Sequence, residues 1–394
     1  MSSSPLAPRA GRIVTRMTAR APDESHRTAT SLELFFDLCF VVAVAQAGAS
    51  LVHALVDNHP GTGVTGYLCV FFGIWWAWMN FSWFASAYDC DDVPYRLLTL
   101  LQMAGVLVYA AGVSRAFDHG DWSITVTGYL LMRVALTTQW LRAARGESGP
   151  TARTARHYAA GLLLCQAAWV AFLFVPAGAR TWLFVVLALA ELSVPVLAER
   201  DHPTSWHPRH IAERYGLFTL IVLGETVAAA TVAVKSALDT HHAPSTLLPT
   251  ALGGLLIVFA AWWIYFAVPA HAHLTSNRQA IPWGYGHYLV FATAAAIGAG
   301  LEVAVEHATG QTHTSSLTAH AAITVPTAVY LATVWLIHTR HHAVTTADRL
   351  TLPLAALAVL ACTYAGDAAV LLTGLTCLLA TAVLTWARAS ASCT

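Results

Sequence analysis

The sequence predicts an all-α polytopic integral membrane protein with about 12 transmembrane helices, arranged as two parallel six-helix repeats. Of its 394 residues 57% are hydrophobic and only 11% are charged, which lies far outside the usual composition of soluble domains. Twelve apolar runs divide the chain, and most of them are long enough to cross a bilayer as a helix. A set of residues also recurs in the same order in the two halves of the chain.

An N-terminal segment, residues 1–30, precedes the first apolar run. It is rich in Ser, Ala, Pro, Thr and Arg, and it contains no apolar stretch of the kind found in a secretory signal peptide. We therefore expect a disordered basic tail on the cytoplasmic side. The apolar runs follow at 33–56, 67–87, 95–113, 122–143, 155–175, 180–198, 211–234, 247–268, 283–303, 317–339, 350–365 and 367–387.

Basic residues divide unevenly between the two sets of loops. If every run crosses the membrane, seventeen basic residues lie on the N-terminal side and only Arg115, Arg180 and Lys235 on the other. Because cytoplasmic loops carry such an excess, we expect a multi-pass protein of the bacterial cell (inner) membrane with both termini cytoplasmic. The net charge is zero, so no nucleic-acid partner is expected. The expected partners are membrane lipids and a small-molecule or ion substrate, and a homo-oligomer is left open.

The two halves of the chain share residues in the same order. The matched sets are Glu33 with Glu213, Phe35 with Tyr215, Trp75-Trp76 with Trp262-Trp263, Pro94 with Pro282 and Gly112 with Gly300. The spacing between partners grows only through loops, as two copies of one six-helix unit would require. We therefore predict a first repeat at 31–200 and a second at 201–390. With an even number of spans in each copy, both copies point the same way across the membrane.

Glu33 and Asp37 open the first apolar run. A spacing of four residues puts both carboxylates on one face of a helix, about 6 Å apart along its axis. A carboxylate in a membrane span is costly unless it faces a bundle interior, a partner or water, which makes both residues candidates for function. The alternative is that Glu33 is only the first-turn acid that a helix N-terminus favours. This alternative is weaker for Asp37, which lies deeper.

The seventh run carries further charged residues. Glu213 and Arg214 open it, and Glu225 lies about 18 Å further along the helix, with no obvious basic residue at a similar depth. A desolvated acid without a basic partner is suited to carrying a proton. The simplest expectation for Arg133 and Glu191, the other ionisable residues deep in apolar runs, is that they pair with each other.

Asp89, Asp91 and Asp92 end the second run. Clustered carboxylates at a membrane edge can hold Mg²⁺, which can in turn hold a substrate diphosphate. Three acids in four residues are more often an ordinary solvated loop. No cofactor is predicted apart from Mg²⁺ in this enzymatic alternative, whose metal ligands would be Asp89, Asp91 and Asp92.

Three stretches of the sequence carry a family resemblance. They are Ser31-Leu-Glu33-Leu-Phe-Phe-Asp37-Leu, His210-Ile-Ala-Glu213-Arg214-Tyr-Gly216-Leu-Phe-Thr-Leu-Ile-Val-Leu-Gly224-Glu225, and Tyr88-Asp89-Cys-Asp91-Asp92-Val-Pro-Tyr-Arg96 followed by Gln102-Met103. In these stretches the chain resembles the bacterial low temperature requirement protein A family. The resemblance covers nearly the whole chain after the tail. It implies a multi-span membrane protein named after a growth phenotype, and it implies no particular reaction or substrate.

The leading hypothesis is a proton-coupled carrier of a small solute or ion, in which acids gate or couple transport and an arginine acts as an ionic latch. Its expected site residues are Glu33, Asp37, Glu213, Arg214 and Glu225. A rival hypothesis is a membrane-embedded Mg²⁺-dependent enzyme acting on an isoprenoid or other lipid diphosphate, by prenyl transfer or terpene cyclisation. Its chamber would be walled by the paired tryptophans, whose rings could stabilise positive charge. A signalling or scaffold protein ranks last, because the short loops leave little room for an effector domain.

Overall fold

The computed structural model describes residues 13–21, 24, 27–239, 244–341 and 345–392. Within these ranges the secondary structure is entirely helical, as the composition predicts, with three short 3₁₀ turns between α-helices. The α-helices are α1 (Ser31–Val56), α2 (Pro60–Tyr88), α3 (Val93–His119), α4 (Ser123–Gly146), α5 (Gly149–Phe172), α6 (Ala177–Ala198), α7 (Pro208–Asp239), α8 (Pro244–Phe266), α9 (Asn277–Ala308), α10 (Ser316–Ile337), α11 (Thr346–Cys362) and α12 (Ala369–Ser392). Each corresponds to one apolar run, which confirms the all-α prediction.

Nine helices of the described chain are long and apolar enough to cross a membrane. The helices outside this set are α4, α5 and α11. Three arginines, Arg133, Arg142 and Arg145, reduce the hydropathy of α4, and α5 has arginines in its first half. Only 17 residues form α11. The protein is therefore a multi-pass membrane protein, while the crossing of all its α-helices stays a prediction.

Local capping signals fix where several helices begin and end. Asp92 precedes α3 with an extended backbone, and its side chain accepts a hydrogen bond from the Tyr95 N–H at 2.9 Å. Gly120 ends the same helix in the left-handed conformation, at φ 63°, which glycine adopts without steric cost. Thr345 and Asp348 form a capping box at the start of α11. These signals lie in the short polar segments between apolar runs, and several helices extend into these segments beyond the predicted runs, as α2 does by beginning at Pro60 where its run begins at 67.

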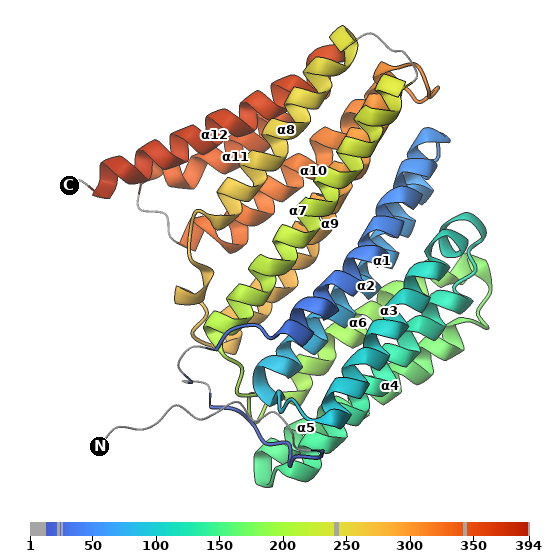
Figure 1. The fold of residues 1–394 in the computed structure, drawn as a ribbon, viewed down its shortest axis with the longest axis vertical. Helices are drawn as coiled ribbons and strands as arrows, with labels where there is room; N and C mark the ends of the chain where they lie inside the picture. The colour runs from blue at the N-terminus through green and yellow to red at the C-terminus, as the bar shows by residue number, and fades with distance from the viewer. Residues whose placement is uncertain (1–12, 22–23, 25–26, 240–243, 342–344, 393–394) are drawn as a thin grey trace. The chain divides into compact units, whose positions relative to one another are not determined.

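The described helices form two compact units, and the first contains Met1–Ala43 and Phe72–Arg214. In this unit α3, α4, α5 and α6 pack in chain order, each against the next (Figure 1). Two glycines bring α3 and α4 close together. A side chain at Gly128 would collide with the backbone of Tyr109, and one at Gly105 would press on the backbone of α4. Small residues at such contacts are typical of packed membrane helices.

The second unit contains Val44–Phe71 and Tyr215–Thr394. Here α9, α10, α11 and α12 also pack in chain order, and α8 packs on α12. Gly300 meets the backbone of α10, as Gly112 meets the backbone of α4 in the first unit. The predicted duplication requires this agreement in packing order. The two compact units divide inside α1, α2 and α7, so they do not test the repeat boundaries, which stay a prediction.

Part of the predicted tail makes tertiary contacts within the first unit, although much of the segment lies outside the described residues. The Thr15 N–H donates to Asp92 Oδ2 at 2.8 Å, and the Arg20 N–H donates to the Ala87 carbonyl at 2.8 Å. These acceptors lie at the N-cap of α3 and in the last turn of α2. Helix ends leave such groups without intrahelical partners. Residues 13–21 are therefore held against helix ends, in contrast to the disorder expected from their composition.

Candidate functional site

The first acid of the predicted site lies in the opening turn of α1. The N–H and hydroxyl of Thr30 donate to Glu33 Oε2 at 2.7 and 3.0 Å, and the Glu33 N–H donates to Thr30 Oγ1 at 3.3 Å. These contacts form a capping box, so Glu33 is a first-turn acid as the simpler alternative expects. It also has a second role, because Glu33 Oε1 lies 3.0 Å from His210 Nε2 in α7, with both side chains fully buried.

One turn further along each helix, Asp37 of α1 pairs with Arg214 of α7. Asp37 Oδ1 accepts hydrogen bonds at 2.7 Å from Arg214 Nη2 and at 2.7 Å from Trp78 Nε1 in α2. Arg214 Nη2 also donates to Ser82 Oγ at 3.3 Å. The side chains of Asp37 and Arg214 are both 0% exposed. In the first unit, α1 and the start of α7 are therefore joined by two acid–base pairs spaced one turn apart.

Glu33, Asp37, His210 and Arg214 are called the buried charge cluster below. Several of its atoms have no hydrogen-bond partner among the described residues. They are Glu33 Oε1, Asp37 Oδ2, both ring nitrogens of His210, and Nε and Nη1 of Arg214. The contact between Glu33 and His210 is close enough for an ion pair but is not aligned as a hydrogen bond. Because buried polar groups are normally satisfied, the cluster has unused capacity for a proton or a small polar ligand.

The other two predicted acids lie elsewhere on α7. Glu213 is half-buried, and its carboxylate accepts a hydrogen bond from the Ala29 N–H at 3.4 Å. Glu225 is half-buried in the part of α7 that belongs to the second unit, and none of the described residues forms a hydrogen bond or ion pair with its side chain. The structure therefore brings together the two acids of α1 with the arginine of α7, and it leaves Glu213 and Glu225 outside the cluster.

The three aspartates after α2 pair with arginines, no two of them share one, and Asp89 also lies 3.6 Å from Arg20. The pairs are Arg27–Asp89 at 3.5 Å, Arg96–Asp91 at 2.8 Å and Arg142–Asp92 at 2.6 Å. Asp91 has a left-handed backbone, with φ 46°, and its side chain is half-exposed, whereas Asp89 and Asp92 are nearly buried. Within the described ranges, no group of three or more His, Cys, Asp or Glu side chains is arranged to hold a metal ion. The magnesium site stays a prediction.

Asp89 and Asp92 have opposite electrostatic surroundings. Burial raises the pKa of Asp89; nearby carboxylates add to this shift and Arg27 opposes it. Burial also acts to raise the pKa of Asp92, but hydrogen bonds from two backbone N–H groups and from Arg142 outweigh it and hold that pKa below its ordinary value. Asp92 is therefore a charged anchor between the start of α3 and the end of α4.

The predicted pair of Arg133 and Glu191 is confirmed and belongs to a larger group in the first unit. Arg133 Nη2 lies 3.1 Å from Glu191 Oε2, with side chains 1% and 2% exposed. Three more donors reach this carboxylate: Trp76 Nε1 at 2.9 Å, Tyr129 OH at 3.0 Å and Trp169 Nε1 at 3.2 Å. Sequence reasoning missed Tyr129 and Trp169, because an aromatic residue in an apolar run looks like ordinary packing, and it considered Trp76 only as a repeat match and a chamber wall.

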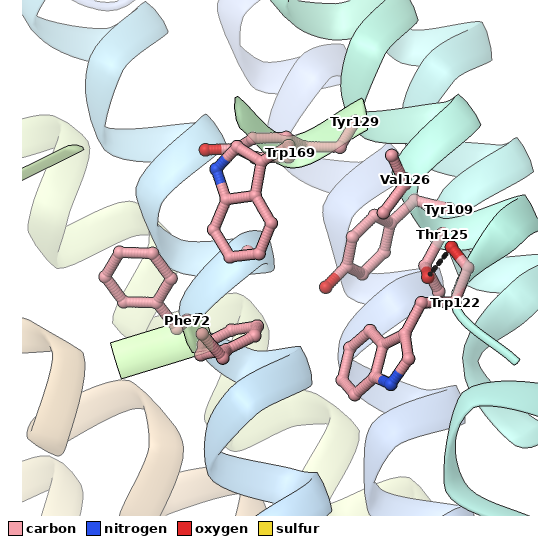
Figure 2. A pocket seen from close by; sticks show the side chains of 9 residues that line it. Phe72, Tyr109, Trp122, Thr125, Val126, Tyr129 and Trp169 are labelled. Carbon is pink, nitrogen blue, oxygen red and sulfur yellow. Dashed lines mark hydrogen bonds between the residues drawn. The ribbon is translucent and has the colours of Figure 1, made fainter. Parts of the chain in front are cut away.

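A small cavity adjoins this group, and Figure 2 shows the side chains around it. Its volume is about 20 Å³, and its lining is almost wholly apolar. The rings that line this aromatic cavity belong to Phe72, Tyr109, Trp122, Tyr129, Trp169 and Phe184. Tyr129 and Trp169 thus contribute rings to the cavity and polar hydrogens to the Glu191 carboxylate. The cavity lies among α2, α3, α4, α5 and α6, inside the first unit.

The two tryptophan pairs that match in the sequence have different environments. Trp75 and Trp76 are buried in the first unit, whereas Trp262 and Trp263 are 46% and 51% exposed in the second. Together with Gly224 of α7, the exposed pair lines an open apolar groove of about 440 Å³. Exposed aromatic rings of this kind are typical of surfaces that face lipid.

The second unit contains a buried polar group that no spacing in the sequence points to. His287 Nδ1 lies 2.7 Å from the Trp283 carbonyl oxygen, and His287 Nε2 lies 2.9 Å from the Tyr265 hydroxyl. Because a carbonyl oxygen can only accept, Nδ1 carries the proton and Nε2 accepts from Tyr265. The ring of His338 lies 5.5 Å from that of His287. This group ties α8, α9 and the end of α10 together.

Comparison with known proteins places the whole cluster inside one family match. The sequence model of the family described as bacterial low temperature requirement A protein (LtrA) matches residues 28–385. The chain is also 29% identical over 242 residues to uncharacterized protein RA0937 of Rhizobium meliloti (strain 1021). That match covers 59% of this chain and 57% of the relative, so it spans little more than half the length of each protein.

Proposed function

This chain belongs to the bacterial low temperature requirement A family, and from that premise we propose that it is a proton-coupled carrier of a small solute or ion. The family match covers a multi-pass membrane protein rich in apolar helices. A proton-coupled carrier needs titratable groups inside the membrane that interact electrostatically with more than one helix. The buried charge cluster meets this need within the first unit.

The proposal depends on one observation: two acid–base pairs are fully buried where α1 meets the start of α7. Each of the two carboxylates has one oxygen without a hydrogen-bond partner among the described residues. A proton that binds Asp37 removes one charge of its pair and leaves the charge of Arg214 uncompensated. Breaking a buried pair in this way costs about 3–5 kcal/mol. Proton binding would therefore change how α1 packs on α7, which is the coupling that a carrier requires.

The four residues of the cluster have distinct roles in this proposal. Glu33 and His210 form the pair that exchanges a proton, because both groups titrate. Asp37 and Arg214 form a latch, since an arginine keeps its charge at all accessible pH values and holds the ionised aspartate. Glu213 and Glu225 are proposed as further coupling acids on α7, by their half-buried positions in the same helix.

The test is solute uptake into proteoliposomes with an acidic exterior, followed by an internal pH indicator and a panel of small solutes. Glu33→Gln and Asp37→Asn are expected to abolish solute-dependent acidification. The matched control is Glu302→Gln, which removes a half-buried acid from α9, far along the chain from the cluster. Protein level and melting temperature are measured for each variant. Unchanged coupled uptake in both cluster variants would overturn the proposal.

Glu225 has a separate test, because it lies in the second unit. If it couples protons, Glu225→Gln should retain uptake driven by a solute gradient but lose the dependence of uptake on the pH gradient. If both the uptake and its dependence on the pH gradient stay as in the wild type, Glu225 has no coupling role. Proton coupling would then depend on the buried charge cluster alone.

We also propose that the protein lies in the inner membrane with both termini in the cytoplasm. The excess of basic residues on one set of loops supports this orientation. Single cysteines placed at exposed residues 13 and 390 should then be labelled by a membrane-impermeant maleimide only after the cells are opened. Labelling of either position in intact spheroplasts would contradict the orientation.

The enzymatic alternative receives less support. Its three metal-binding candidates each contact a different arginine, so magnesium binding would require these pairs to open. Turnover of a prenyl diphosphate by purified protein with Mg²⁺, lost in Asp91→Asn, would establish it. Asp91 is the informative position, since its half-exposed pair contributes little to stability and its loss should leave the fold intact.

A further inference from the structure

The Glu191 carboxylate lies in a set of donors suited to an oxyanion. Arg133 Nη2, Tyr129 OH, Trp76 Nε1 and Trp169 Nε1 all reach it, at distances from 2.9 to 3.2 Å. A carboxylate offers about four lone-pair sites, so these four bonds saturate it. The four donor residues are called the carboxylate cradle below. In this structure the cradle holds an acid that the protein itself supplies.

Donors remain unused beside the cradle. Arg133 Nε and Nη1 are buried and have no hydrogen-bond partner among the described residues, and the same holds for both polar atoms of the Gln166 side chain. Arg133 is one turn from Tyr129 on α4 and Gln166 is one turn from Trp169 on α5, and the ring centres of Tyr129 and Trp169 are 6.1 Å apart. Arg133, which already donates to Glu191, therefore has two further donors without a hydrogen-bond partner among the described residues.

The aromatic cavity sets the size of what could bind here. A cavity that holds one water needs about 10–15 Å³, and one that holds benzene is about 150 Å³. The aromatic cavity, at about 20 Å³, admits a methyl-sized group and excludes a ring. Because its lining is apolar, a methyl group is favoured over water. Tyr129 and Trp169 belong to both the cavity and the cradle, so a carboxylate in the cradle would have its alkyl group in the cavity.

We propose that the carboxylate cradle and the aromatic cavity together form a site for a short-chain monocarboxylate of the size of acetate or propionate. This inference rests on the proposed carrier function, since it names that carrier's substrate. Glu191 takes up one proton from water and becomes neutral, and the substrate carboxylate takes its place among the donors. The negative charge of the substrate then balances Arg133, so the buried site stays neutral with one proton bound per carboxylate.

The groups that face Glu191 set the pH dependence of this exchange. Arg133 and Tyr129 face it from α4, and the Cys165 thiol of α5 lies close enough to both charges to interact with them. From α2 and α5 the neutral indole groups of Trp76 and Trp169 donate hydrogen bonds to it. Arg133 keeps its charge, so the protonation of Glu191 is the step that frees the cradle.

The experiment measures binding of radiolabelled propionate to the purified protein at mildly acidic and mildly alkaline pH. Affinity should fall about tenfold for each pH unit over the range in which Glu191 is ionised, since one proton accompanies each carboxylate. Glu191→Gln should bind propionate with the same affinity at both pH values, and Arg133→Gln should not bind it. Benzoate should compete poorly because the cavity excludes a ring. Absent binding by the wild type at both pH values, or equal competition by benzoate, would overturn the proposal.

Variants that fold poorly are covered by a second measurement. Glu191→Gln leaves Arg133 buried without its partner, so its melting temperature should fall and should rise again with added propionate but not with chloride at equal ionic strength. The matched control is Asp37→Asn, which leaves Arg214 unpaired in the same unit and should not recover with propionate. Recovery of both variants to the same extent would mean a general anion effect and would refute a specific site.

The two proposals fail in different ways. If propionate binds with the expected pH dependence but a pH gradient drives no uptake of it, the site stands and the carrier function is refuted. If a pH gradient drives uptake of another solute through the buried charge cluster and propionate does not bind, only the carboxylate site is refuted.

Discussion

Removing one partner of the Asp37–Arg214 pair should cost far more stability than removing an exposed ion pair. Asp37→Asn would leave the Arg214 guanidinium fully buried without its counter-charge, facing a neutral amide oxygen at residue 37 and Ser82 Oγ at 3.3 Å. Loss of one member of a buried pair costs about 3–5 kcal/mol. The exposed pair of Arg115 and Asp121, with side chains 58% and 32% exposed, supplies the control, and Asp121→Asn should cost less than about 1 kcal/mol.

A double-mutant cycle separates the pair from its neighbours. Asp37→Asn and Arg214→Met should each lower the free energy of unfolding by several kcal/mol, whereas the double variant should lose less than the sum of the two. The coupling should lie near the upper end of the range of about 0.5–3 kcal/mol seen for groups in direct contact. Unfolding in detergent micelles at neutral pH, followed by circular dichroism, measures each value. Additive losses would refute the buried pair, and with it the junction of α1 with the start of α7.

Three further substitutions, one of them with a matched control, test the fold of the first unit. The pKa of Asp92 in the folded protein lies below the ordinary aspartate pKa of about 4. Its contribution to stability is therefore present above the ordinary pKa and is lost as the pH falls through the lower native pKa. The melting temperature of the wild type should fall more steeply in acid than that of Asp92→Asn. Gly128→Ala should destabilise the protein by about 1–3 kcal/mol, because the new methyl group meets the backbone of Tyr109. Gly178 has open space around it, so the control Gly178→Ala should be neutral or slightly stabilising in the same melting assay. Thr30→Ala removes half of the capping box of α1 and should cost about 0.5–2 kcal/mol in chemical unfolding; a loss near zero would show that Glu33 alone holds the helix start.

The number and order of the helices were predictable because each helix coincides with an apolar run in the sequence. Each apolar run corresponds to one α-helix, and the helix ends lie at polar or turn-forming residues such as Asp92 and Gly120. The pairing of Arg133 with Glu191 was predictable for a similar reason, since a lone charge in a membrane span is too costly to leave without a partner. In both cases the cost of burial is visible in the sequence.

The partners of the site residues were not predictable to the same degree. Periodicity places Glu33 and Asp37 on one face of α1, but it does not say which helix that face meets. His210 and Trp78 therefore had no assigned role until the structure placed them against these acids. A useful signal was present at Thr30, which with Glu33 has the T-x-x-E spacing of a capping box.

The acidic segment after α2 shows a different limit of sequence reasoning. Closeness along the chain suggested a shared metal for Asp89, Asp91 and Asp92 as an alternative to an ordinary loop, but it did not indicate the arginine partners that the structure places against each aspartate. The left-handed backbone at Asp91 gives that side chain more exposure than its neighbours have. A backbone conformation of this kind is not contained in a sequence pattern.

The most direct test of the account is whether the buried charge cluster takes up a proton. Infrared difference spectra between alkaline and acidic pH detect the carbonyl stretch of a newly protonated carboxylic acid in the reconstituted protein. The account predicts a band from a buried acid in the wild type that is lost or shifted in Glu33→Gln or Asp37→Asn and unchanged in Glu302→Gln. A spectrum that is the same in the wild type and in both cluster variants would contradict proton binding at the junction of α1 and α7.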